Sequence, residues 1–169
     1  MGNFIDFEKY KLRKKKVDSM DLKEFAKLVI YFANHTKNRL YKTKLNKLLF
    51  YTQFLFYKDY EKRLLNKEFI CDYYGPVIQD IDSLLDQLEK LGLIEFKTNE
   101  YGKYVDTRYK LSEDNYSKEE LFILKKVSEK FEDYSSSEIS DYSHKESLWK
   151  ESSLKDIIPL ELACDLNEF

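Results

Sequence analysis

The stretch PVIQDIDSLLDQLEKLGLIEFKTNEYGKYVDTRYKL, residues 76–111, decides the fold class of this 169-residue chain. Its apolar residues first recur at helical spacing, so they predict an amphipathic helix with Pro76 at its first position and Gly92 just past its end. These apolar residues are Val77, Ile81, Leu84, Leu85, Leu88 and Leu91. The alternating segments on either side of residues 99–102 (NEYG) then predict a β-hairpin. A helix followed directly by a hairpin is the usual outline of a winged helix, although a fold alone does not fix a function.

Towards the N-terminus, the sequence predicts an extended segment and two further helices. Residues 69–74 (FICDYY) are too aromatic and too short for a helix and indicate an extended segment. Apolar residues at helical spacing predict one helix from residue 19 that ends between Asn34 and Asn38, and a second helix after Thr43. A short polar connection joins these two helices, which favours a helix-turn-helix interpretation.

Towards the C-terminus, two capping boxes mark helix starts. Each places a Glu three residues after a Ser, in residues 117–120 (SKEE) and 135–138 (SSSE). Nothing marks a second domain, so we expect a basic arm over residues 1–18 and one domain over residues 19–169. The predicted fold class is mainly α with a small β-hairpin (α+β), a compact helical domain with a winged-helix-like outline.

Composition indicates a globular chain, because 43% of the residues are hydrophobic and 36% are charged. Residues 1–70 carry 17 Lys and Arg against 8 Asp and Glu, whereas residues 71–169 carry 12 against 23. The basic arm either meets an acidic partner or nucleic acid, or it is solvated or docks on the acidic half. No secretory leader opens the chain and no run of 18 uncharged apolar residues occurs, so we expect a cytoplasmic protein without a membrane partner.

Residue types that carry enzyme chemistry are scarce. The two histidines, His35 and His144, and the two cysteines, Cys71 and Cys164, match no metal or disulfide spacing, and we expect both cysteines to be packed in the core. The chain has no glycine-rich phosphate loop, no GxSxG elbow and no HExxH motif. The sequence therefore predicts no catalytic residue, no metal and no cofactor, and hence no enzyme.

Five short motifs occur in order along the chain: KTKLNKLLFY (residues 42–51), YGPV (74–77), SSSEI (135–139), HKESLW (144–149) and IPLELA (158–163). Together they resemble the Panacea family, the SocA-like antitoxin domain, and the resemblance covers roughly residues 19–163. Members of that family are associated with prophages and pair with unrelated toxins. The resemblance therefore implies a non-catalytic antitoxin that binds and neutralises a cognate toxin protein, which the adjacent gene encodes.

Six residues within these motifs are candidates for partner contact. They are Lys44, Lys47, Tyr51, Tyr74, His144 and Trp149. Trp149 is either a hot spot for a partner or a packing residue whose indole N–H binds a backbone acceptor, and in the second case His144 holds a turn by hydrogen bonding. Tyr74 marks a chain reversal, and it either serves this structural role alone or is also presented at a surface groove. Lys44 and Lys47 are expected beside the apolar stripe of their helix, where they are solvated or pair with the acidic half.

The alternative function is a winged-helix transcriptional regulator that binds DNA. The helix pair, the hairpin and the basic half favour it, and a literal helix-turn-helix would make Thr43, Lys44 and Lys47 phosphate contacts. The acidic character of the helix expected over residues 76–91 weakens this alternative, because such a helix repels a duplex. Its charged residues are Asp80, Asp82, Asp86, Glu89 and Lys90.

Overall fold

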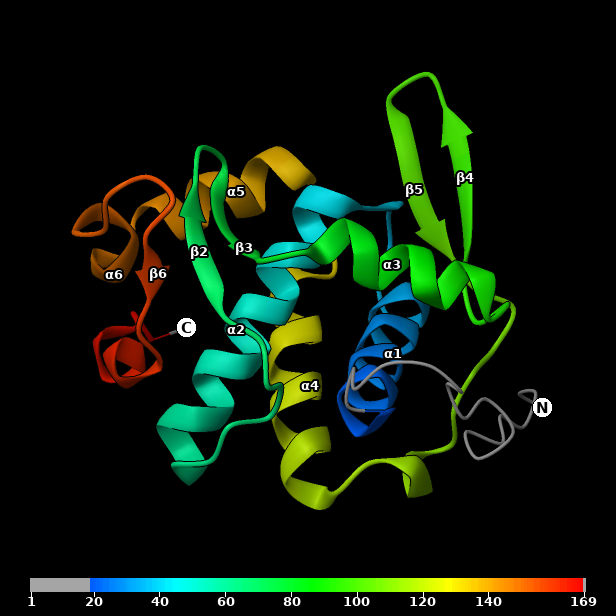
Figure 1. The fold of residues 1–169 in the computed structure, drawn as a ribbon, viewed down its shortest axis with the longest axis horizontal. Coiled ribbons are helices and arrows are strands. Elements are labelled where there is room, and N and C mark those ends of the chain that lie inside the picture. Colours follow the sequence, from blue (N-terminus) through cyan, green and yellow to red (C-terminus); the bar gives the residue numbers. More distant parts are fainter. Residues whose placement is uncertain (1–18, 169) are drawn as a thin grey trace.

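The structure is a computed structural model that describes residues 19–168, and Figure 1 shows its ribbon. The helices are α1 (Ser19–Asn34), α2 (Lys42–Tyr60), α3 (Ile81–Lys90), α4 (Lys118–Phe131), α5 (Ser136–His144) and α6 (Ser147–Lys150), with short 3₁₀ helices η2 (Glu113–Asn115) and η3 (Leu160–Asp165). The strands are β1 (Leu40–Tyr41), β2 (Phe69–Asp72), β3 (Gly75–Ile78), β4 (Glu95–Asn99), β5 (Gly102–Asp106) and β6 (Ile157–Ile158). The expected class, mainly α with a small β part, is confirmed. The basic arm expected over residues 1–18 lies outside the described residues.

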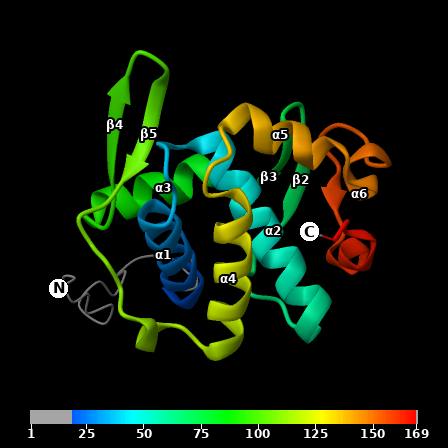
Figure 2. The same ribbon diagram turned by 180° about the vertical axis from the view of Figure 1, so that it is seen from behind.

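Helix α2 lies at the centre of the molecule. Every residue from 44 to 56 is buried, so this part of the helix turns no face to solvent. Helices α1, α4 and α5 pack around it together with β3 and η3, and Figure 2 shows α4 running beside it. A helix that is covered on all sides has no polar stripe, and any polar residue within it must find its partners inside the protein.

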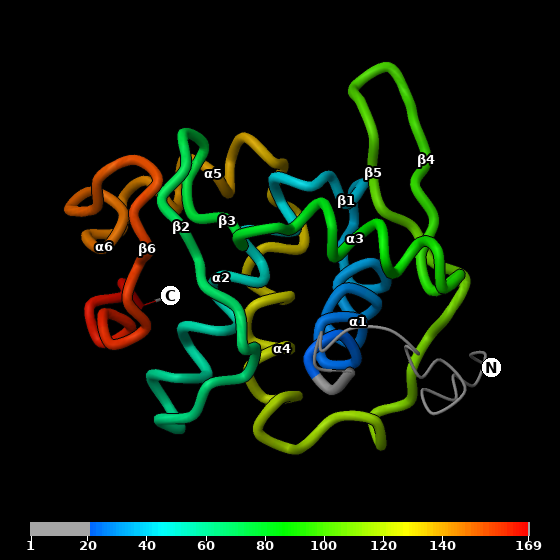
Figure 3. Tube along the Cα trace, in the orientation of Figure 1, coloured from blue at the N-terminus to red at the C-terminus, as the bar shows by residue number. Residues whose placement is uncertain are grey.

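The elements around the first sheet have the predicted winged-helix-like outline, with one strand, β1, that the sequence does not predict. The chain runs through α1, β1, α2, α3, β4 and β5, with the β2–β3 hairpin inserted between α2 and α3. The sheet order is β1-β5-β4 with antiparallel pairing, and Figure 3 shows β1 beside β5. Val105 of β5 is buried and pairs with Leu40 on one side and Phe96 on the other. The predicted hairpin is confirmed, with Glu100 and Tyr101 connecting its strands.

Helix α3 begins later than the sequence predicts. It starts at Ile81, whereas residues 75–78 form strand β3, in which Pro76 pairs with Cys71. The prediction of a helical start at Pro76 is wrong because Val77 and Ile81 happen to fit a helical period, while the pairing that makes 75–78 a strand comes from β2. Proline is tolerated there because β3 lies at the edge of the β3-β2-β6 sheet.

The predicted end of α3 is confirmed. Gly92 has a φ of +74°, and its N–H donates to the Glu89 carbonyl at 2.9 Å. The Leu93 N–H donates to the Leu88 carbonyl at 3.0 Å. This pair of bonds is the Schellman arrangement, which satisfies the last carbonyls of a helix through a residue in the left-handed region.

The serine caps of both predicted capping boxes are confirmed in the C-terminal half. The Ser117 Oγ accepts a hydrogen bond from the Glu120 N–H at 3.0 Å, and the Ser135 Oγ accepts one from the Glu138 N–H at 3.1 Å. Each serine thereby satisfies one of the unpaired donors in the first turn of its helix, α4 and α5 respectively. No helix among the described residues is long and apolar enough to cross a membrane.

The two cysteines differ in burial. Cys71 is buried in β2 as expected, whereas Cys164 is exposed, so the expectation of a packed Cys164 is wrong. Cys164 belongs to the short helix η3, which buries only Leu160 and Ala163. A 3₁₀ helix of this length turns its remaining side chains outward.

Candidate functional site

The β2–β3 hairpin carries two exposed tyrosines at its tip. Tyr73 and Tyr74 connect the two strands and are 71% and 64% exposed, and their ring centroids lie 5.1 Å apart. The Asp72 carboxylate accepts a hydrogen bond from the Tyr73 N–H at 2.8 Å and forms an ion pair with the Lys155 Nζ at 3.0 Å. A side chain that binds the backbone of the next residues fixes a turn. The tip therefore has a defined conformation although its aromatic rings are in solvent.

Side chains of helix α2 form hydrogen bonds with the backbone groups on the outer edge of β3. The Asn46 Oδ1 accepts a hydrogen bond from the Ile78 N–H at 3.0 Å, and the Lys47 Nζ donates to the Pro76 carbonyl at 3.0 Å. Edge strands otherwise leave such groups unpaired and open to another chain. Two adjacent side chains of α2 thus take the place of a neighbouring strand.

Lys47 is fully buried, contrary to the expectation that it is solvated or ion-paired. Among the described residues it forms no ion pair, and its ammonium group binds a backbone carbonyl. Burial lowers the pKa of Lys47 to about 8, and the negative charge of Asp72 opposes this shift. The prediction is wrong because every side of α2 is covered at this point, and an enclosed ammonium group cannot serve as a phosphate contact.

Gly75 occupies a position where a side chain would collide with this lysine. Its φ is +109°, in the region that favours glycine. A Cβ at this position would lie 2.6 Å from the Lys47 Cε and 2.6 Å from the Ser143 Oγ. Both the backbone conformation and the close approach of α2 and α5 therefore require glycine here.

Helix α5 holds the other side of the tip through Ser140, and Ser143 binds Ser140 within the same helix. The Ser140 Oγ donates a hydrogen bond to the Tyr74 carbonyl at 2.6 Å. The fully buried Ser143 donates to the Ser140 carbonyl at 2.8 Å. These contacts join the exposed residue Tyr74 to a helix that follows it by more than 60 positions.

The rings of His144 and Trp149 stack on each other next to the hairpin. Their ring centroids are 4.0 Å apart with an interplanar angle of 19°, and the Trp149 Nε1 donates to the Asp72 carbonyl at 3.4 Å. Burial and the positive charge of Lys47 lower the pKa of His144, whereas a hydrogen bond to the Tyr74 backbone raises it. This geometry agrees with the packing interpretation of both residues, and their contact with a partner stays a prediction.

A buried hydrogen-bonded pair links α2 to the residues after α5. The Tyr51 hydroxyl donates to one Glu146 oxygen at 3.0 Å, and the Asn167 N–H donates to the other at 2.9 Å. Burial raises the pKa of Glu146, and burial together with the Glu146 charge raises the pKa of Tyr51. Tyr51 is fully buried, so it supports the fold from within rather than forming part of an accessible surface.

Lys44 lies apart from the hairpin and holds the loop between α1 and β1. Its Nζ donates to the Thr36 Oγ1 and the Asn38 Oδ1, both at 2.9 Å. Burial lowers the pKa of Lys44 to about 8, and the charge of Asp133 is the largest opposing influence. Lys44 is buried and forms no ion pair among the described residues, so its expected solvation is also wrong.

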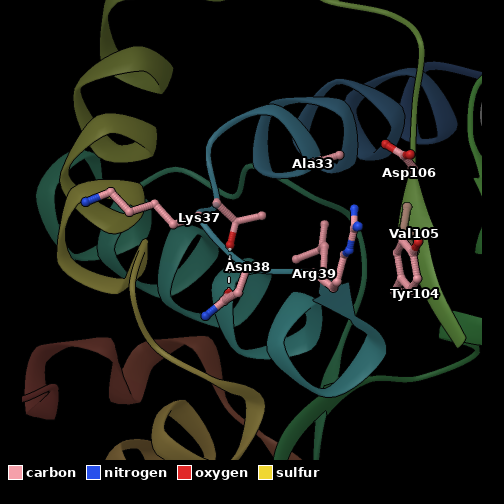
Figure 4. A pocket seen from close by; sticks show the side chains of 9 residues that line it. Ala33, Lys37, Asn38, Arg39, Tyr104, Val105 and Asp106 are labelled. Carbon is pink, nitrogen blue, oxygen red and sulfur yellow. Dashed lines mark hydrogen bonds between the residues drawn. The ribbon is translucent and has the colours of Figure 1, made fainter. Parts of the chain in front are cut away.

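Beside this loop is a pocket of about 500 Å³, which Figure 4 shows from close by. Arg39 and Asp106 are among the residues that line it. The guanidinium carbon of Arg39 lies 5.0 Å from the centroid of the Tyr104 ring. None of the six predicted residues lines it. The pocket therefore does not join the candidate site.

Four of the six predicted residues meet at the β2–β3 hairpin, namely Lys47, Tyr74, His144 and Trp149. Sequence analysis missed the residues that complete the site, which are Asn46, Tyr73, Ser140 and Ser143. Asn46 lies inside the KTKLNKLLFY motif, which could have identified it. The two serines give no signal, because a small hydroxyl residue in a helix has many roles; Ser143 binds a carbonyl of its own helix, and only Ser140 binds an acceptor in another element.

The site has no metal-binding character within residues 19–168, where no three His, Cys, Asp or Glu side chains come together. Its buried polar groups are directed at backbone atoms of the hairpin. What this arrangement can do is hold the hairpin in one conformation and present Tyr73 and Tyr74 to solvent.

The fold and the site thus define a mainly helical domain, with a winged-helix-like outline, built around one anchored hairpin. The chain matches the family described as antitoxin SocA-like, Panacea domain, over residues 45–150. This match covers more than half of the chain and includes the β2–β3 hairpin, α5 and α6, so the chain belongs to the SocA-like Panacea family. Comparison with the curated proteins and with the solved structures gave no match.

Proposed function

We propose that this protein is an antitoxin that neutralises a cognate toxin protein, the product of the adjacent gene, by binding it directly. Membership of the SocA-like family supports an antitoxin-type role. The convergence of the family motifs on one hairpin supports direct binding, because Lys47, Gly75 and Ser143 fix its base while Tyr74 stays exposed. Binding needs no catalytic group, so we expect no enzymatic activity and no cofactor.

Tyr74, with His144 and Trp149 below it, is the proposed centre of contact. Aromatic residues are enriched at interface hot spots because they bury a large area and lose little conformational entropy. A tip that is already ordered loses less entropy on binding than a flexible loop does. Lys44, Lys47 and Tyr51, which are enclosed in the free protein, contribute by holding the fold.

Co-expression with the product of the adjacent gene tests this function. We expect that gene alone to stop growth, this protein to restore growth, and the two proteins to purify together as a complex of defined stoichiometry. A toxin from an unrelated system serves as the control for a general effect on growth. A toxic neighbour that is neither bound nor relieved would contradict the proposal, as would a harmless neighbour.

DNA binding is the second candidate, favoured by the winged-helix-like order of α1, β1, α2, α3, β4 and β5. The burial of Lys44 and Lys47 weakens it, and so does the acidic character of α3, whose only basic residue is Lys90. A complex with DNA from upstream of the gene, weakening steeply as salt rises, would support this candidate. Absence of any such complex would remove it.

A further inference from the structure

We propose that the toxin docks on one apolar patch, formed by Tyr73 and Tyr74 of the hairpin tip together with Leu154 and Ile157, and that it does so with an apolar segment flanked by Lys or Arg. This inference rests on the proposed function and specifies its site and the chemistry of its partner. These four residues are called the tip patch below.

The tip patch gathers most of the large hydrophobic side chains that the described residues expose. Six such side chains are exposed in all, and four of them belong to the patch; the other two are Tyr101 and Phe122. Soluble domains scatter single apolar residues over their surfaces, whereas grouped ones mark interaction sites. This grouping therefore indicates a docking surface.

Backbone pairing brings the two halves of the patch together. Ile157 of β6 pairs with Ile70 of β2 in antiparallel register. The pairing continues towards the tip, because the Cys71 N–H donates to the Asp156 carbonyl at 2.8 Å and the Lys155 N–H donates to the Cys71 carbonyl at 2.6 Å. The chain turns over residues 153–156, where the Asp156 N–H donates to the Ser153 carbonyl at 3.0 Å. Leu154 therefore lies in a turn that Lys155 joins to Cys71 and Asp72, and Figure 1 shows the loop between α6 and β6 next to the tip of β2.

The charges around the patch select a basic partner. Three carboxylates adjoin it: Asp72 at the turn, Asp156 beside Cys71, and Asp141, whose charge raises the pKa of the nearby His144. Lys155 neutralises only Asp72. The half of the chain that contains the patch holds 12 Lys and Arg against 23 Asp and Glu. An apolar centre with an acidic rim fits a segment that carries an apolar side chain between cations.

The probe for this inference is the purified product of the adjacent gene, and the readout is its dissociation constant. We expect Tyr73→Ala and Tyr74→Ala each to weaken binding by about 10-fold or more, as truncation of aromatic hot spots does. Asp156→Asn is expected to weaken it by about 2- to 5-fold, an effect that disappears at high salt. The matched control is Tyr101→Ala at the tip of the β4–β5 hairpin, which we expect to change binding by less than about 2-fold.

The possible results distinguish a failure of the tip-patch proposal from a failure of the proposed antitoxin function. If the neighbouring protein is toxic and bound, but the Tyr73 and Tyr74 variants bind like the wild type, the tip patch is wrong and the antitoxin function stands. If the neighbouring protein is neither toxic nor bound, both fail. If the free protein is a dimer by light scattering and the two tip variants are monomers, the patch joins two copies of this chain, and that result also overturns the inference.

Discussion

The two β-hairpins of this molecule are similar in length but are held in place by different means. The β4–β5 hairpin pairs with β1; β4 is exposed over most of its length, whereas β5 buries Tyr104 and Val105. The β2–β3 hairpin is fixed by side chains of α2 and α5, with Asn46 and Lys47 on one side and Ser140 on the other. Both hairpins end in exposed tyrosines. The difference shows that strand pairing is the main support of the β4–β5 hairpin, whereas buried polar side chains from α2 and α5 add to the support of the β2–β3 hairpin.

The largest expected contrast comes from one glycine in each hairpin. Gly75 and Gly102 both have positive φ, +109° and +125°, but only at Gly75 would an added Cβ have neighbours within 4 Å, the Lys47 Cε and the Ser143 Oγ among them. We expect Gly75→Ala to lower the free energy of unfolding by about 3 kcal/mol or more, and Gly102→Ala to lower it by about 1–2 kcal/mol, because only the first adds a collision to the backbone strain. Urea denaturation measures both. Equal losses would show that the close approach of α2 and α5 to the hairpin is not important for stability.

The next contrast comes from an asparagine associated with each hairpin. Asn46→Ala leaves the buried Ile78 N–H without its acceptor, so we expect a loss of about 1–3 kcal/mol in the free energy of unfolding. Asn99→Ala removes exposed bonds with the Tyr41 hydroxyl and with the Tyr101 N–H, and should cost less than about 1 kcal/mol because water can replace both. Thermal and urea unfolding of the two variants test the difference. A loss of similar size in both would mean that Asn46 does not serve as the edge partner of β3.

The pH dependence of stability tests the burial of Lys47 itself. Its pKa is lowered to about 8, so the folded state loses this proton at a lower pH than the unfolded state does. The free energy of unfolding should therefore rise with pH above about 8, by about 1.5 kcal/mol between pH 8 and pH 9.5 from this lysine. This rise in the free energy of unfolding ends near pH 10. Above that pH the tyrosines of the unfolded chain ionise, whereas Tyr51 in the folded protein stays protonated because its pKa is raised, and this difference lowers the free energy of unfolding.

The control for this effect is Lys47→Met, which keeps the length of the side chain and removes its charge. The variant should lose the share of the rise that Lys47 supplies and keep the share from Lys44, whose pKa is lowered to about 8 as well. Parallel curves for the wild type and the variant would contradict the account of a buried, charged Lys47.

The smallest expected effect is on the stability of the tip variants. Tyr73, Tyr74 and Tyr101 are each more than 60% exposed, so their replacement by Ala should change the free energy of unfolding by less than about 0.5 kcal/mol. A larger loss in the Tyr73 or Tyr74 variant alone would mean that the tip stabilises the fold, and that its exposure is not available for a partner.

The same contrast between hairpins explains what the sequence could and could not predict. The β4–β5 hairpin and the end of α3 were predictable because alternation, a glycine-containing turn and Gly92 are local signals. Strand β3 was not, since its residues become a strand only through β2 and through Asn46 and Lys47, which lie some 30 positions away.

The sequence could not predict the burial of Lys44 and Lys47 for a related reason. Lysine is ordinarily a surface residue, and only the packing of helices and strand β3 around α2 encloses these two. The motifs identified four of the residues that meet at the hairpin, because residue types at fixed spacings can be recognised in a sequence without knowledge of their contacts. The supporting serines Ser140 and Ser143 needed the fold itself.

Hydrogen exchange of the complex with the product of the adjacent gene, the proposed toxin, reports on both hairpins in one experiment. We expect slower exchange on binding in residues 70–75 and 153–158, and unchanged exchange in residues 97–104 at the tip of the β4–β5 hairpin. Protection of residues 97–104 with none at 70–75 would contradict this expectation, and would assign partner binding to the β4–β5 hairpin.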